Sequence, residues 1–231
     1  MKRSIIYMLF VSFLIVTTSA WGGTITAGDL ITLTYGSAHY NDGGEFRIIG
    51  PSSSYDFETF CLERDEYFTP GNQYYVTSIS NIAELGGVNT NSGDPLDDRT
   101  AWLYLMFRTN PSAIGYDNSV ADAGALQQVI WYLEQELGGS NSINWTDAQW
   151  AAYWANPSKY LTIAGAIGFY NFAVDAVSHG WNNNGQVAIV NLGNSSGTVY
   201  NQSQLTLVPE PATLLLLGFG LFGIGLQRRK R

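Results

Sequence analysis

Residues 123–139 read AGALQQVIWYLEQELGG. Apolar side chains recur in this stretch with helical spacing, at Leu126, Val129, Ile130, Leu133 and Leu137. This i, i+3, i+4, i+7 pattern predicts an amphipathic helix over residues 123–137, and the glycine pair at 138–139 ends it. Gln127 stands in the first turn of the predicted helix. The fold is therefore expected to contain a central helix with a polar side chain near its start.

Three further segments of the middle region have helical patterns. They cover residues 100–107, 148–154 and 160–177. Asp97 and Asp98 can cap the first of these helices, and Thr146 with Asp147 can cap the second, because such side chains satisfy the free N–H groups of a helix start. The middle of the chain is therefore predicted to be helical.

Strand-like patterns flank the helical region on both sides. They cover residues 24–35, 45–49, 57–62, 73–79, 186–192, 197–200 and 205–208. Turn residues separate the early strands, as in the Asn-Asp-Gly-Gly sequence at 41–44. We predict an α+β fold in one domain, residues 21–207: a β-sandwich or barrel with a helical insertion in the middle. The first and last groups of strands can share a sheet in such a fold.

Charge is scarce and unevenly distributed. The chain of 231 residues has a formal net charge of −8, and 13% of its residues are charged, against a usual share of roughly 25%. Between residues 21 and 208, five basic residues stand against 18 acidic ones. Nucleic acids and anionic membrane surfaces need clustered cations, so we expect the central region to bind neither.

The first 20 residues have the three parts of a secretory signal peptide. Lys2 and Arg3 form the positive start, residues 5–16 form an apolar stretch, and residues 18–20 (Thr-Ser-Ala) form a small-residue cleavage site. We therefore expect signal peptidase to remove residues 1–20. An uncut membrane anchor is the alternative.

The C-terminus also has three parts. A Pro209-Glu210-Pro211 sequence is followed by an apolar run over residues 212–226. The chain then closes with the basic residues Arg228, Arg229, Lys230 and Arg231. The apolar run is shorter than the roughly 20 residues that span a bilayer. It can still form a transmembrane helix, with the basic tail on the cytoplasmic side.

This ending resembles a PEP-CTERM sorting signal, which is read by an exosortase in Gram-negative, often biofilm-forming, bacteria. The resemblance implies that segment 208–231 anchors the protein in the inner membrane until it is processed. The protein would then reach the cell surface or the extracellular matrix. The resemblance concerns the destination alone, because PEP-CTERM proteins carry many unrelated domains.

The sequence has few of the residues that build metal or redox sites. A single cysteine, Cys61, excludes an intramolecular disulfide and a zinc ribbon, and the two histidines, His39 and His179, lie far apart. The HExxH, GxSxG and GxxxxGK[ST] motifs are absent from the sequence. We therefore expect no metal, no cofactor and no enzyme activity beyond, at most, autocatalytic thioester formation.

Cys61 and Gln127 suggest that thioester. A thiolate held against a carboxamide can attack its carbonyl carbon, release ammonia and leave a thioester, while free N–H groups of a helix start hold the oxyanion. The product is an electrophile that can capture an amine or a hydroxyl on another surface. The alternative is that Cys61 is a buried free thiol, which behaves as a small hydrophobic residue.

Segment 55–135 resembles the thioester domains of bacterial surface adhesins. In these domains an aromatic-Cys-aliphatic strand precedes a Thr-Gln-x-Ala-Ile/Val-Trp motif. The matching positions are Phe60, Cys61, Leu62, Gln127, Ile130 and Trp131. Leu126 replaces the threonine and Val129 the alanine. The resemblance implies a Cys61–Gln127 crosslink and a role in adhesion, although those adhesins come mostly from Gram-positive bacteria.

Two weaker motifs carry other hypotheses. Residues 89–98 are rich in oxygen ligands, but the spacing of an EF-hand calcium loop is not met, so a turn with a helix cap is the simpler interpretation. The acids Glu58, Glu63, Asp65 and Glu66 could serve a glycosidase, but no spacing marks a catalytic pair.

Tryptophans provide the last candidates. Trp145 and Trp150 flank a predicted loop and could stack on sugars, whereas Trp131 lies near the apolar stripe and is assigned to the core.

Two functional hypotheses follow for the exported protein. The first is attachment, for example in a biofilm, through a Cys61–Gln127 thioester that reacts with surface amines or hydroxyls. The second is a non-covalent binder of exopolysaccharide, or a structural matrix protein.

Overall fold

A computed structural model describes residues 24–41, 43–84, 93–139, 142–194, 196 and 199–209. The predicted signal peptide and the predicted membrane helix at 212–226 lie outside these residues. Within the described ranges, no helix is long and apolar enough to cross a membrane.

The strands form one large sheet and one small two-stranded sheet. They are β1 (Leu30–Tyr40), β2 (Gly43–Ile49), β3 (Asp56–Thr59), β4 (Asn72–Ser80), β5 (Ile82–Ala83), β6 (Asp94–Pro95), β7 (Val187–Gly193) and β8 (Tyr200–Leu207). The large sheet has the order β3-β2-β1-β4-β7-β8 with antiparallel neighbours, and β5 pairs with β6. The first and last strands of the chain therefore share one sheet, as predicted.

The two edges of the large sheet meet just after β3. Residues 60–62 lie against residues 203–205 of β8, with Cys61 and Gln204 as bridge partners and backbone hydrogen bonds of 3.1 and 3.2 Å on either side. We call this contact the seam. The α+β class is confirmed. A sandwich or a complete barrel is not, because the described strands form one sheet whose edges meet along this short seam.

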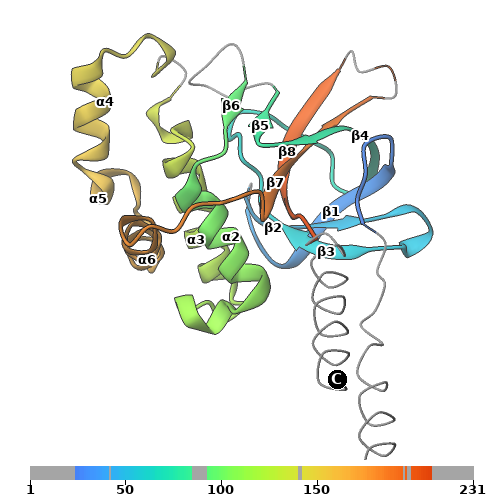
Figure 1. Cartoon of the computed structure of the whole chain (residues 1–231), viewed down its shortest axis with the longest axis horizontal. Helices are drawn as coiled ribbons and strands as arrows, with labels where there is room; N and C mark the ends of the chain where they lie inside the picture. The colour runs from blue at the N-terminus through green and yellow to red at the C-terminus, as the bar shows by residue number, and fades with distance from the viewer. Residues whose placement is uncertain are drawn as a thin grey trace, which may run out of the picture.

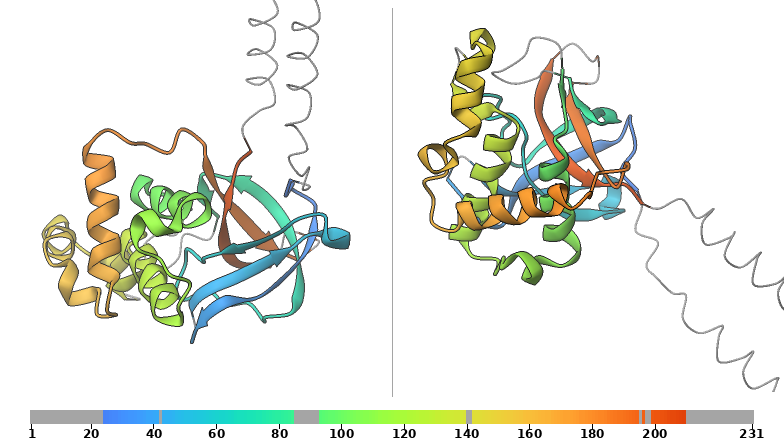
Figure 2. Two further views of the ribbon diagram at one scale, coloured as in Figure 1. Left: turned by 90° about the horizontal axis from the view of Figure 1, so that it is seen from below. Right: turned by 60° about the vertical axis from the view of Figure 1, so that its left-hand side comes forward.

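The helices follow between β6 and β7 and gather on one side of the large sheet (Figures 1 and 2). The α-helices are α2 (Asp98–Thr109), α3 (Val120–Leu133), α4 (Asp147–Trp154), α5 (Pro157–Tyr160) and α6 (Ala166–Ser178). Short 3-10 helices cover Pro51–Ser53, Pro111–Ile114, Glu136–Gly138 and Ser142–Asn144. Asp97 caps α2 by accepting the N–H of Arg99 at 2.7 Å, and Thr146 caps α4, as predicted.

Helix α3 lies between two apolar cores. Leu126 and Ile130 belong to the core that the helices share, whereas Trp131 packs against the core of the sheet, which also contains Cys61. The helix packs against β1 and β2. Gln127 and Trp131 are four residues apart and therefore lie on one face of α3, the face toward the sheet.

Two predicted helices differ in the structure. Helix α3 starts at Val120, where the Ser119 hydroxyl accepts the N–H of Asp122, and it ends four residues earlier than predicted. Gln127 is therefore the eighth residue of the helix and lies in its third turn. The predicted helix over 160–177 is interrupted between α5 and α6, because Gly165 adopts a left-handed conformation with φ of 93° before α6 begins.

The strand predictions need smaller corrections. The two strands predicted at 197–200 and 205–208 are one strand, β8, and the predicted strand at 24–35 lies further along the chain as β1. The two-residue strands β5 and β6 were not predicted, because a strand this short carries no alternation of apolar residues.

Candidate functional site

Cys61 is fixed by the backbone of the seam. Its side chain is fully buried, and its neighbour Leu62 donates an N–H to the carbonyl of Ser203 at 3.2 Å. On the other side, the Thr59 hydroxyl donates to the carbonyl of Leu205 at 2.7 Å. The sulfur therefore lies on a buried segment that is hydrogen-bonded between the two edges of the sheet.

The Gln127 carboxamide binds directly to Cys61. Its Nε2 donates to the Cys61 carbonyl oxygen at 2.8 Å. Its Oε1 accepts from the Cys61 N–H and from the thiol, both at 3.3 Å. The exposed fraction of Gln127 is 1%. The structure thus brings together the two side chains that the sequence singles out, and places the sulfur next to the carbonyl group of the amide.

The predicted source of oxyanion donors is wrong. Gln127 lies in the third turn of α3, where backbone N–H groups are already bonded within the helix. The donor on Oε1 is instead the Cys61 N–H. Leu126, which replaces a threonine of the thioester-domain motif, is fully buried in the helical core. The backbone of Cys61 therefore orients the amide in this chain.

The surroundings of the thiol favour its protonated form. Burial raises the pKa of Cys61 well above its usual range, and the negative charge of Glu63 raises it further. The indole of Trp131 acts in the opposite direction and lowers this pKa. Its Nε1–H is buried and has no hydrogen-bond partner within the described ranges, so it can stabilise negative charge on the sulfur.

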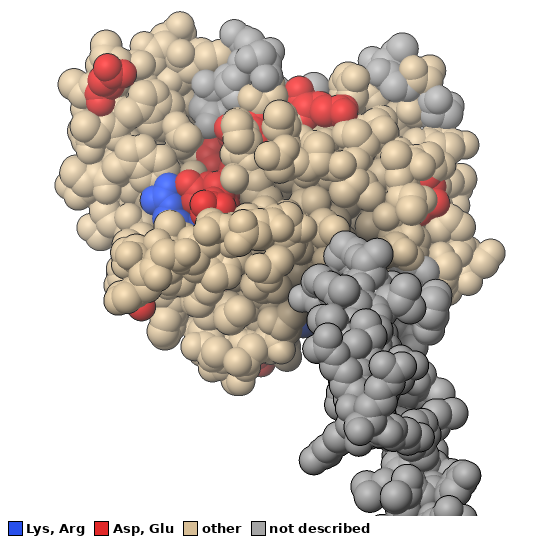
Figure 3. Space-filling model, in the orientation of Figure 1, with Lys and Arg blue, Asp and Glu red and all other residues tan. Residues whose placement is uncertain are grey.

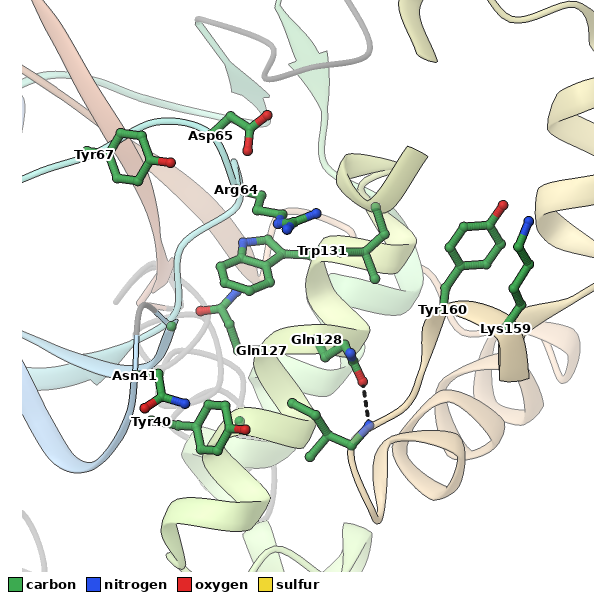
Figure 4. A pocket seen from close by; sticks show the side chains of 14 residues that line it. Tyr40, Asn41, Arg64, Asp65, Tyr67, Gln127, Gln128, Trp131, Lys159 and Tyr160 are labelled. Carbon is green, nitrogen blue, oxygen red and sulfur yellow. Dashed lines mark hydrogen bonds between the residues drawn. The ribbon is translucent and has the colours of Figure 1, made fainter. Parts of the chain in front are cut away.

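A cavity of about 530 Å³ opens beside the pair (Figure 4). Its wall includes Gln127 but not Cys61, so access to the carbonyl is from the glutamine side. The rings that line it belong to Tyr40, Tyr67, Trp131 and Tyr160. The polar side chains that line it are Asn41, Arg64, Asp65, Gln127, Gln128 and Lys159. A concave site with aromatic walls and a few polar groups is typical of a ligand pocket.

The buried Glu63 and the half-buried Glu66 follow Cys61 along the chain and do not line the cavity. Burial raises the pKa of Glu63 to about 7 and that of Glu66 to about 8, and the charges of Glu63 and Glu136 add to the effect on Glu66. The Glu63 carboxylate accepts the N–H of Ser203 at 2.9 Å. Within the described ranges Asp65 is the one carboxylate on the cavity wall, so this arrangement does not favour the glycosidase hypothesis.

The oxygen-rich segment 89–98 lies partly outside the described residues. Its described acids already have protein partners: Asp97 caps α2 and pairs with Arg99, and Asp98 accepts the N–H of Asn183 at 3.0 Å. In the part of the chain that the structure describes, no group of three His, Cys, Asp or Glu side chains could hold a metal ion. The turn with a helix cap is thus the interpretation that the geometry favours.

The three candidate tryptophans lie in two separate places. Trp145 and Trp150 pack on each other, with ring centroids 4.9 Å apart, and neither lines the described cavity. Trp131 packs against the core of the sheet, as its spacing predicts, and also lies on the cavity wall. Its position four residues after Gln127 was the available signal, since residues at i and i+4 share a helix face. No local pattern brought Arg64 and Lys159 together, because they come from distant segments.

The site and fold define an α+β domain with a buried cysteine–glutamine contact beside an aromatic cavity. The family model for the PEP-CTERM protein-sorting motif matches residues 207–230. No curated protein and no solved structure matches the chain. The resemblance of segment 55–135 to thioester domains therefore stays a prediction.

The matched motif establishes the destination of the protein. It marks the chain for export, for membrane anchoring and then for processing by an exosortase. Pro209 is exposed just beyond β8, whereas Glu210, Pro211 and the basic residues 228–231 lie outside the described residues. The protein is thus an exosortase-sorted extracellular or surface protein.

Proposed function

We propose that the exported domain attaches its carrier to another surface through a thioester between Cys61 Sγ and the side-chain carbonyl carbon of Gln127. The observation that carries the proposal is the 3.3 Å contact between Sγ and Oε1, with the Cys61 N–H on the same oxygen. The reacting carbon is one bond away from that oxygen. The contact holds the sulfur next to the amide, so the proposed reaction needs no bimolecular encounter.

The first step forms the thioester. The sulfur attacks the carbonyl carbon of Gln127, the thiol proton passes to the amide nitrogen, and ammonia leaves as the C–N bond breaks. The Cys61 N–H holds the oxygen while negative charge develops on it. The Trp131 indole lowers the pKa of Cys61 and can stabilise partial negative charge on the sulfur.

The second step captures the partner surface. An amine or a hydroxyl enters through the cavity, attacks the same carbon and forms an amide or an ester, while the C–S bond breaks and the proton returns to Cys61. The buried seam shields the sulfur side of the thioester from water. Exosortase sorting places the domain where such partners are found, at the cell surface or in the matrix.

Intact mass tests the first step. We expect the full chain to lack about 17 Da, the mass of ammonia, whereas Cys61→Ala and Gln127→Ala chains have their full masses. Methylamine should abolish the deficit, add the amine to the chain and release one titratable thiol. A full mass in fresh wild-type protein, with one thiol that titrates on unfolding, would overturn the proposal.

A second candidate function rests on the burial of Cys61. A fully buried thiol with a raised pKa is an ordinary core residue, and the aromatic cavity can bind a ligand without it. The protein would then be a non-covalent carbohydrate-binding or structural matrix protein. A full mass together with ligand binding that survives Cys61→Ala would favour this function.

A further inference from the structure

Most cations of the described chain are held by other groups of the protein. Arg47 pairs with Asp56 at 2.5 Å, and Arg99 pairs with Asp97 at 2.5 Å. Arg108 donates to the carbonyl of Glu58 and to the hydroxyl of Tyr104, and its guanidinium lies over the ring of Phe57. These three side chains therefore have structural roles on the sheet and on α2.

The other two cations of the described chain line the cavity. Arg64 comes from the segment after the seam and Lys159 comes from α5, and neither has an acidic partner within ion-pair distance in the described ranges. The Lys159 ammonium lies 5.1 Å from the ring centroid of Tyr160. Asp65 is the one carboxylate of the wall, so the formal charge of the cavity is positive.

This local charge opposes that of the molecule. The chain has a formal net charge of −8, and the face drawn in Figure 3 shows more acidic than basic side chains among few charges overall. Folding therefore places two cations without acidic partners, from distant segments of an acidic chain, on the wall of one cavity. Cations on opposite sides of a concave surface attract anionic groups, and guanidinium matches the geometry of a carboxylate.

The aromatic side chains of the cavity wall indicate which class of molecule carries the anionic group. Tyr67 is 75% exposed, and Figure 4 shows Arg64 beside the indole of Trp131, with Tyr40 and Asn41 on the hairpin side. Exposed rings offer flat apolar faces that fit the C–H faces of a sugar ring. Amides such as Asn41 can exchange hydrogen bonds with hydroxyls.

We propose that the cavity binds an acidic saccharide. One carboxylate of the saccharide binds Arg64 and a second binds Lys159, because the two cations lie on opposite sides of the cavity (Figure 4), and the sugar rings pack on the aromatic wall. Recognition does not require the thioester. The chemical outcome rests on the proposed function: a saccharide hydroxyl attacks the Gln127 carbonyl carbon, the C–S bond breaks, the hydroxyl proton goes to Cys61, and an ester remains. The two cations disfavour a protonated amine in the same place.

Binding of defined oligosaccharides tests this site. We expect the full chain in detergent to bind tetragalacturonate, measured by calorimetry, and to bind neutral cellotetraose at least about tenfold more weakly, because charged hydrogen bonds are the stronger ones. The double variant Arg64→Gln/Lys159→Gln should lose at least about tenfold in affinity for tetragalacturonate. The matched control Arg47→Gln removes an exposed cation that does not line the cavity and should bind as wild type does.

Two outcomes would overturn the proposal. One is equal affinity for the acidic and the neutral probe, and the other is wild-type affinity in a double variant that melts at the wild-type temperature. The Cys61→Ala chain separates this proposal from the thioester, because it should bind tetragalacturonate normally although it cannot form an ester. If the chain binds tetragalacturonate but shows no mass deficit, only the thioester proposal is wrong. If it shows the mass deficit but does not prefer the acidic probe, only the saccharide site is wrong.

Discussion

At the scale of single residues, the segment that leaves the seam combines burial with negative charge. Glu63 is 2% exposed, and one of its carboxylate oxygens has no hydrogen-bond partner within the described ranges. The same holds for one oxygen of Glu66. Buried carboxyls without full hydrogen bonding prefer the neutral form, which explains the raised pKa of about 7 for Glu63 and about 8 for Glu66.

These raised pKa values predict that stability falls as pH rises. The reference pKa of a glutamate is 4.5, so between pH 4.5 and about 8 the folded state holds protons that the unfolded chain has lost. The stabilisation is complete below pH 4.5 and is lost as pH passes through the folded pKa values. We expect a lower melting temperature at pH 8 than at pH 5, measured by circular dichroism.

Glu66→Gln tests the origin of this dependence. A neutral amide should raise the melting temperature at pH 8 by roughly 2–4 °C, for a gain on the order of 1 kcal/mol, and change it little at pH 5. The matched control Asp175→Asn alters an exposed carboxyl of α6 and should keep the wild-type pH dependence. A Glu66→Gln curve parallel to that of wild type over this range would contradict the assignment.

The sequence alone identified Cys61 and Gln127 as a candidate pair, because it contains a single cysteine and places a glutamine on one face of a predicted helix. The donor on the amide oxygen was not predictable, since it is the backbone N–H of Cys61 brought there by the seam. Arg64 and Lys159 lie far apart in the sequence, and only tertiary structure places them in one cavity. Local patterns thus identify a candidate residue pair better than they identify a binding pocket.

At the scale of elements, the site depends on the close approach of α3 to the β1–β2 hairpin. A Cβ at Gly124 would lie 2.6 Å from the ring of Tyr40. A Cβ at Gly43 would lie 2.5 Å from the indole of Trp131 and 2.9 Å from Cγ of Gln127. Two glycines without side chains therefore set the distance between helix and hairpin, and with it the position of the Gln127 amide.

Gly43→Ala should loosen the site. The added methyl group overlaps with Trp131 and Gln127, so we expect a loss of about 1–3 kcal/mol in unfolding free energy, measured by urea denaturation. The same displacement should reduce or abolish the mass deficit of thioester formation. The matched control Gly168→Ala adds a methyl in open space on α6 and should be neutral or slightly stabilising. Wild-type stability and a full mass deficit in Gly43→Ala would contradict this packing argument.

The helices show which helix boundaries can be predicted from the sequence. The caps at Asp97 and Thr146 were predicted, because a capping side chain next to a periodic apolar run is a local signal. The start of α3 was missed, although Ser119 and Asp122 form such a cap, because the apolar pattern begins later. The interruption before α6 depends on the conformation of Gly165, which the apolar pattern of 160–177 conceals.

At the scale of the whole molecule, the domain is built around a sheet that combines the two ends of the chain. The seam joins the segment after β3 to β8, so the site depends on strands from both halves of the sequence. The ends of the described chain leave from the sheet, away from the helices (Figure 2). The α+β class and the shared sheet followed from the pattern of the elements. The seam depends on long-range pairing, which that pattern does not specify.

This arrangement separates the sorting motif from the cysteine–glutamine site. Pro209 is exposed directly after β8, and the sorting motif matched at residues 207–230 continues from there. Because the motif begins where the sheet ends, a change within Pro209-Glu210-Pro211 should leave the Cys61–Gln127 contact intact. Sorting and the proposed thioester chemistry can therefore be tested independently in one chain.

We expect Glu210→Ala/Pro211→Ala to block processing while leaving the domain folded. In fractionated cells that carry an exosortase, the variant should remain in the membrane fraction at its unprocessed length, because the recognition motif is lost while the apolar run and its basic tail remain. The control Val199→Ala, at an exposed position outside the matched residues 207–230, should be sorted as wild type. A double variant that is processed and released like wild type would show that the Pro-Glu-Pro sequence does not direct sorting. The mass deficit at Cys61 should be the same in both variants, because the seam that forms the site lies entirely within the folded domain.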